Sequence, residues 1–154
     1  QIKWSDTSTV DNEMLNRTLK ELEEAAGKTE KWNDSIIDMV RLYFVDIKNI
    51  FRVLYSKMKL NGRIFFNVSN SAYFNVLINT LEICASIAEQ EGFYVIEIRD
   101  ARKLKTSPQH FTKGKNTSVA CMLDWFPTIA EFCGGKLLEG VIVLEKRENT
   151  IESK

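Results

Sequence analysis

The sequence predicts a single α/β domain in which two strands run parallel because a helix joins them. Two apolar runs read as buried strands, Arg63 to Val68 and Phe93 to Arg99. The segment between them has helical period. Such a strand–helix–strand unit is almost always a right-handed crossover, so both strands should point the same way. A third apolar run, Leu138 to Lys146, predicts a further strand.

The first strand, Arg63 to Val68, is expected to be covered on both faces. Its apolar side chains are nearly continuous, which is typical of strands that lie between two layers of helices. The turn before it is predicted at Asn61-Gly62, because that residue pair favours tight turns.

Two helices should precede this strand. Apolar residues recur at helical spacing from Asp11, and Gly27 can supply a left-handed stop. A second, strongly amphipathic helix should begin near Ser35, whose spacing to Asp38 resembles a capping box, and should run to about Lys57.

A third helix should begin directly after Ser69-Asn70-Ser71 and end at Gly92. Its period is given by Val76, Leu77, Leu81, Cys84, Ile87 and Ala88. After the second strand the pattern breaks, and residues 101–136 read as a long insertion that holds both prolines. Long ordered loops usually serve a function.

Composition excludes several classes of protein. The 154 residues suffice for one domain, 1–154, and the 21 basic and 21 acidic residues balance, so no overall field attracts nucleic acid or a membrane. No apolar run approaches the roughly 18 residues that span a bilayer. Three scattered cysteines form neither a disulfide framework nor a zinc site, which favours a reduced, cytoplasmic protein. His110 is the only histidine, so no multi-histidine metal site is expected.

The order of these elements, together with several short motifs, carries a family resemblance. Lys59 to Gly62 forms a turn before a strand that ends in Asn70-Ser71, and Gly92-Phe93 opens the next strand. Other matches are Arg99, Arg102, Ser107-Pro108-Gln109 and Glu139. From Ser35 to Lys146 the chain resembles the carboxy-terminal half of a Rossmann-like, S-adenosylmethionine-dependent methyltransferase, especially the bacterial DNA amino-methyltransferases of restriction-modification systems.

The resemblance implies a partial Rossmann-like sheet of two parallel strands with an antiparallel third strand, Leu138–Glu145, between them. It also implies an enzyme that transfers a methyl group from S-adenosylmethionine to an adenine or cytosine amine in DNA. An RNA or small-molecule methyltransferase, or a non-catalytic α/β module that binds a partner, are the alternatives.

Two motifs of that family are missing from the sequence. There is no Pro-Pro-aromatic segment to hold a flipped base, and no Gly-rich loop follows a strand to cradle the cofactor. We therefore interpret the chain as an inactive carboxy-terminal fragment, assign no catalytic residue, and expect the isolated chain not to bind S-adenosylmethionine. The strand Arg63–Val68 would then lack a neighbour, so we expect the chain to form a homo-oligomer through this edge or to cover it with its own insertion.

Two groups of polar residues are candidates for the site. The first, Asn67, Ser69, Asn70 and Ser71, follows a strand at its carboxyl end, where open α/β sheets bind their ligands. The competing interpretation is that Ser69 or Ser71 only caps the next helix.

The second group is a basic, aromatic-containing segment that suggests contact with DNA phosphates. Its members are Arg102, Lys103, Lys105, Lys113 and Lys115, with Phe111 among them. The competing interpretation is a solubilising loop without a partner.

Overall fold

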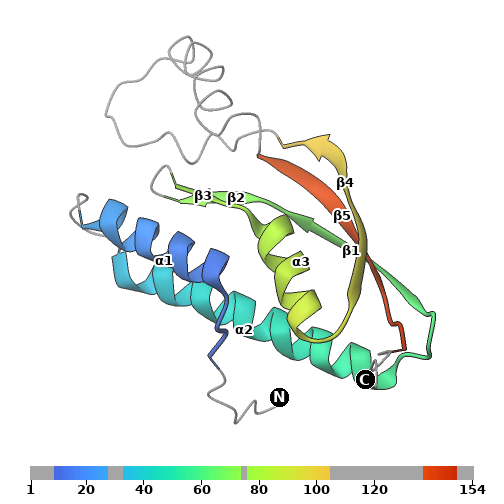
Figure 1. Ribbon diagram of the computed structural model, residues 1–154. Helices are drawn as coiled ribbons and strands as arrows, with labels where there is room; N and C mark the ends of the chain where they lie inside the picture. The colour runs from blue at the N-terminus through green and yellow to red at the C-terminus, as the bar shows by residue number, and fades with distance from the viewer. Residues whose placement is uncertain (1–8, 28–32, 74–75, 105–136, 149–154) are drawn as a thin grey trace.

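The computed structural model describes residues 9–27, 33–73, 76–104 and 137–148. Three helices and two small sheets make up this part of the chain (Figure 1). In chain order the elements are α1 (Glu13–Ala26), α2 (Asn33–Lys57), β1 (Arg63–Ser69), β2 (Ser71–Tyr73), β3 (Val76–Ile78), α3 (Thr80–Gln90), β4 (Tyr94–Lys103) and β5 (Leu138–Glu145). The predicted α/β class is confirmed. None of the described helices is long and apolar enough to cross a membrane.

The main sheet has the strand order β1-β5-β4, with β5 antiparallel to both neighbours. The position predicted for the last strand, between the first two, is confirmed. Since β1 and β4 are each antiparallel to β5, they run in the same direction. They do not pair with each other, however, and every pairing among the described strands is antiparallel.

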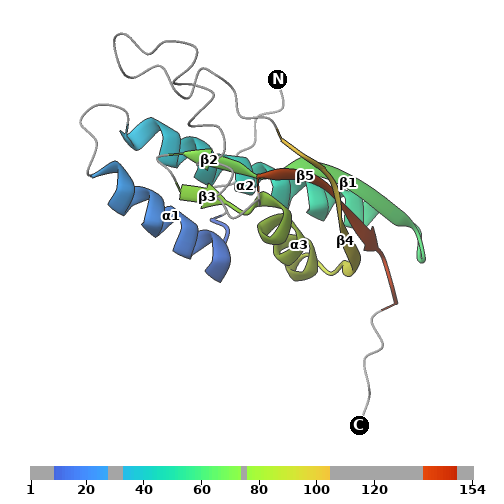
Figure 2. The same ribbon diagram turned by 90° about the horizontal axis from the view of Figure 1, so that it is seen from above.

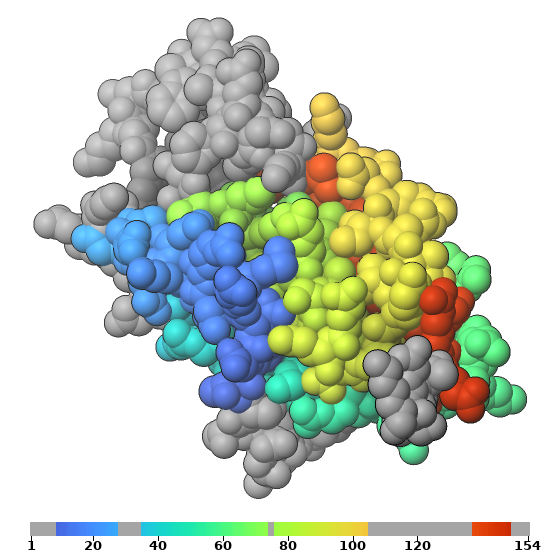
Figure 3. All heavy atoms as spheres, viewed as in Figure 1, coloured from blue at the N-terminus to red at the C-terminus, as the bar shows by residue number. Residues whose placement is uncertain are grey.

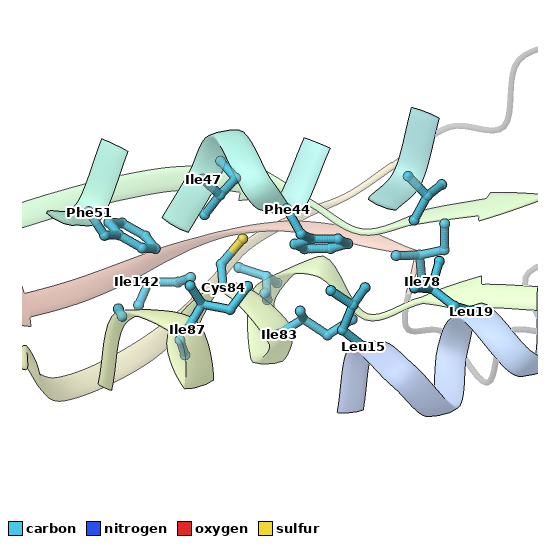
Figure 4. Packing of buried hydrophobic residues seen from close by; sticks show 14 of the residues in the cluster. Leu15, Leu19, Phe44, Ile47, Phe51, Ile78, Ile83, Cys84, Ile87 and Ile142 are labelled. Atoms are coloured by element: carbon cyan, nitrogen blue, oxygen red, sulfur yellow. The ribbon is translucent and has the colours of Figure 1, made fainter. Parts of the chain in front are cut away.

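All three helices lie on the same side of this sheet (Figures 1 and 2). α2 and α3 pack against it, whereas α1 packs against α2 and β3. The ring of Phe51 on α2 lies 5.1 Å from that of Phe66 on β1 and 6.1 Å from that of Phe93. In Figure 4, Phe51 and its neighbours on α2 face Cys84 and Ile87 of α3. Figure 3 shows α1 and α3 side by side, with β4 next to α3. Burying these side chains supplies the main stabilisation of the fold.

The expectation that β1 is covered on both faces is wrong. Exposed and partly buried residues alternate along the strand, and Phe65 is 67% exposed. The run of apolar residues looked continuous because Phe65 stands between Ile64 and Phe66. Arg63, Phe65 and Asn67 occupy alternate positions, and in a strand with one covered face such positions share the exposed face.

The third helix begins later than predicted. Val76 and Leu77 belong to β3, which pairs with β2 in a hairpin in which Ser71 is opposite Ile78. α3 begins only at Thr80. Aromatic and β-branched residues favour extended backbone, and here that preference outweighs a helical period that two positions happened to satisfy.

Two predicted helix signals are also wrong. Gly27 follows α1 with φ −61°, so the helix ends without a left-handed residue. α2 begins at Asn33, which places Ser35 inside its first turn and not at the cap position. The end of α2 at Lys57 and the end of α3 before Gly92 are confirmed, and Gly92 has φ 103°.

The connection from α2 to β1 is fixed by Lys146, the first residue after β5. The Lys146 ammonium donates hydrogen bonds to the carbonyls of Tyr55 and Met58, at 2.7 and 3.0 Å. These carbonyls lie at the end of α2, where a cation is favoured. The predicted turn at Asn61-Gly62 is confirmed, with Asn61 in the left-handed region at φ 62°.

The predicted insertion, 101–136, starts too early. Residues 101–103 belong to β4, which pairs with β5 across two register shifts. The polar residues 101–103 did not indicate a strand in the sequence. Nearly every residue of β4 is exposed, so the strand needs few apolar side chains. Residues 105–136 lie outside the described part of the chain.

Gly140→Ala should destabilise the protein by about 1–3 kcal/mol, because the added methyl overpacks a closed contact. Its Cβ would lie 2.9 Å from the Arg99 carbonyl oxygen and 2.9 Å from the Leu81 side chain of α3. Gly27→Ala is the control, since its Cβ would meet nothing closer than 3.6 Å. Urea unfolding of both variants checks the difference, and equal stabilities would contradict the tight approach of α3 to β5.

Candidate functional site

A hollow of about 290 Å³ lies between α2 and the carboxyl end of β1. We call it the β1-end pocket. Its walls are mainly apolar, and several hydroxyl groups stand among them. The lining residues are Met39, Val40, Tyr43, Phe44, Ser69, Ser71, Tyr73, Ile78 and Thr80. The sheet end predicted to bind a ligand therefore does border a pocket.

Two of the four polar residues predicted for this edge line the pocket. Ser69 ends β1 and Ser71 begins β2, and both are partly exposed. Neither caps a helix, because α3 begins only at Thr80, after the hairpin.

Asn70 takes the capping role instead. It is only 5% exposed, and its Oδ1 accepts a hydrogen bond from the Leu81 backbone N–H at 3.0 Å. This satisfies a donor at the start of α3, where Asn79 makes no side-chain cap bond. Sequence reasoning did not find this contact because the hairpin separates the two residues along the chain.

Asn67 does not line the pocket. Its amide donates to Glu139 at 3.2 Å on the face of the sheet opposite the helices, and it is exposed. Asn67 and Asn70 thus make their contacts elsewhere, with Glu139 and Leu81, and the four candidates do not form one site.

Tyr43 is a wall residue that the sequence did not single out. Burial raises its pKa to about 12, and the nearby Cys84 adds to this shift. The hydroxyl is therefore protonated at neutral pH and can donate a hydrogen bond. Its ring meets Phe44 edge-on at 5.1 Å. The helical period of α2 marked both residues as apolar but did not indicate which of them faced a hollow.

The chemistry of the β1-end pocket is that of binding. Apolar walls with a few hydroxyls suit a small flat group that carries polar atoms at its edge. The described residues of the lining include no carboxylate, imidazole or thiol to move a proton. Among the described residues, no group of three or more His, Cys, Asp or Glu side chains could hold a metal ion.

The basic candidates are only partly described. Arg102 is exposed on β4, and its guanidinium forms an ion pair with Glu139. Lys103 is exposed and forms no ion pair with the described residues. Ser69, Glu139 and Arg102 stand opposite one another across the sheet, so these cations lie at the same sheet end as the pocket. Lys105, Lys113, Lys115 and His110 fall outside the described residues.

Comparison with known proteins gives no further assignment. No family model, curated protein or solved structure matches this chain.

At its other end, the open face of the sheet carries a network of charges around Glu145. Arg63 and Arg147 donate to its carboxylate at 2.9 and 2.7 Å. Arg147 also lies over the Tyr94 ring, 3.4 Å from the centroid. The hydrogen bonds from Arg147 and then Arg63 lower the pKa of Glu145 below its usual value. This carboxylate stays ionised and ties the ends of β1 and β4 to β5.

Glu145→Gln should weaken the dependence of stability on pH in the acid range. The folded pKa of Glu145 lies below its usual value of 4.5, so the stability that it contributes is present above that value and is lost as the pH falls through the folded pKa. The free energy of unfolding in urea, measured at neutral pH and in acid, checks this. Glu148→Gln, at an exposed residue without an ion pair to the described residues, should leave the dependence unchanged. Equal acid sensitivity of both variants would contradict the prediction.

Proposed function

We propose that this chain is the carboxy-terminal part of a Rossmann-like, S-adenosylmethionine-dependent DNA methyltransferase. The complete enzyme would transfer a methyl group to an adenine or cytosine amine. The strand order β1-β5-β4 carries the proposal. β1 and β4 run the same way, α3 joins them, and β5 fills the space between them in the opposite direction. This is the arrangement expected from the resemblance.

In this proposal the β1-end pocket borders the substrate. It lies at the carboxyl end of a strand, and its apolar walls and hydroxyls suit the face and edge of a planar base. Chemistry on a base requires that the base leave the duplex, and such a base is bound by flat apolar side chains and hydrogen bonds. Residues that this chain does not contain would bind the methyl donor and hold the target amine.

Filling the β1-end pocket should lower methyl transfer by the complete enzyme. We expect Ser71→Leu to reduce kcat/KM about tenfold or more, a loss of at least about 1.4 kcal/mol of transition-state stabilisation. Ser56→Leu is the matched control, since Ser56 is exposed near the other end of α2. Transfer of a tritiated methyl group to duplex DNA, to RNA and to free nucleosides is the measurement.

The same assay separates this function from its alternatives. Methyl transfer to RNA or nucleosides but not to DNA would show that DNA is not the substrate. No transfer to any of them would contradict the proposed activity.

The basic segment should act through phosphates. Changing Lys103 and Lys105 together to Ala should lower the salt slope of DNA binding by the complete enzyme by about two units, since each lost phosphate contact removes about one. Arg102→Ala should change it less, because Glu139 already pairs with that guanidinium. Fluorescence anisotropy over a salt series measures the slope, and an unchanged slope in the double variant would remove this support for a DNA substrate.

A further inference from the structure

The outer edge of β1 presents a regular row of backbone groups. At the two ends of the β1–β5 ladder, the Asn70 backbone N–H donates to the Leu138 carbonyl at 2.9 Å. The Lys146 backbone N–H donates to the Gly62 carbonyl at 3.1 Å. In an antiparallel ladder only alternate residues bond to the partner strand. The even-numbered residues of β1 therefore bond to β5. The N–H and C=O groups of Arg63, Phe65, Asn67 and Ser69 point to the open edge, without a partner among the described residues.

In the part of the chain that the structure describes, this edge lacks the usual protection against pairing. Natural edge strands are guarded by lysines, prolines or bulges. β1 has neither residue type, and its register with β5 is unbroken over its full length. Its one charged side chain, Arg63, is bound to Glu145.

A second exposed feature, the seam of α2, lies beside this edge. Residues spaced alternately by four and three form it: Met39, Tyr43, Asp46, Ile50, Val53 and Lys57. That spacing is typical of a helix that packs against another helix. The four uncharged members are between 41% and 48% exposed. Met39 and Tyr43 line the β1-end pocket together with Ser69, so the seam begins on the same side as the open edge.

The two features share a centre. The ring contact between Phe51 and Phe66, at 5.1 Å, places the middle of β1 level with residue 51 of α2. A two-fold axis at that level pairs the edge of β1 with itself in antiparallel direction. Arg63 then stands opposite Ser69 of the second copy and Phe65 opposite Asn67, so no like charges meet.

The seam is self-complementary about the same axis. Asp46 precedes Phe51 by five residues and Lys57 follows it by six, so each Asp46 lies level with Lys57 of the second copy. Ile50 lies level with Val53 of the second copy. The negative charge of Asp46 in one copy is thus paired with the positive charge of Lys57 in the other.

We propose that two copies of this chain associate through β1, in an antiparallel pair centred on Phe66, with their α2 seams packed together. The outward N–H and C=O groups of all four edge residues then bond to the other copy, and the sheet continues across the interface. The proposal concerns the chain itself and is independent of the methyltransferase assignment. A strand supplied by a longer protein would compete for the same edge.

The edge is tested by Asn67→Pro and Asn67→Ala. Proline removes one outward N–H but no bond to β5, a substitution that edge strands tolerate. In analytical ultracentrifugation we expect the unaltered chain and Asn67→Ala to dimerise with micromolar affinity, and Asn67→Pro to dimerise at least tenfold more weakly. Circular dichroism and thermal unfolding verify that both variants fold. A monomer at all concentrations, or equal dimer affinity of the two variants, overturns the proposal.

The seam is tested by exchanging its charges. Asp46→Lys and Lys57→Asp should each weaken the dimer, because like charges then face each other. The double variant should recover the affinity, since the pair is restored in reverse. Recovery supports this register. Single variants without effect, or a double variant weaker than either, overturn it even if a dimer forms by other contacts.

Discussion

The position of β5 between β1 and β4 is the constraint on which the rest of the structure depends. β1 and β4 do not touch, so each is part of the sheet only through β5. On the helical side, the fully buried Ile142 and Leu144 of β5 close the core against α2 and α3. On the open side, Glu145 holds Arg63 and Arg147. The pairings of β5 with β1 and β4 join residues far apart in sequence, and such long-range pairing slows folding.

Much of this fold could be predicted because its strands and longest helix carry strong local patterns. The apolar run Val141 to Leu144 and the period of α2 identify their elements without help from neighbours. Errors arose where the local pattern was ambiguous. Val76 and Leu77 satisfy a helical period, yet pairing with β2 decides their conformation. Gly27 can adopt a left-handed conformation, but its φ of −61° is right-handed.

The candidate site was harder to predict because it is assembled from distant segments. Ser69 and Ser71 were found since the carboxyl end of a strand is a place where ligands bind. Tyr43 and Met39 were missed because the apolar residues of α2 have two different roles that the sequence pattern does not distinguish. Some of them pack against the sheet and α3, and others form a wall and a seam that the described residues leave open. The contact of Phe51 with Phe66 of β1 shows which side of α2 packs against the sheet, and the sequence does not show this contact.

Burial of Cys84 makes its thiol a chemical reporter of motion in the core. Its side chain is fully buried between α2 and α3, and desolvation raises the pKa of its thiol to about 12. Only the thiolate attacks an alkylating reagent, so almost no reactive form exists at neutral pH while the helices stay together. Reaction at Cys84 must wait until α3 separates from α2. The rate of its modification therefore reports how often the interior of this protein opens.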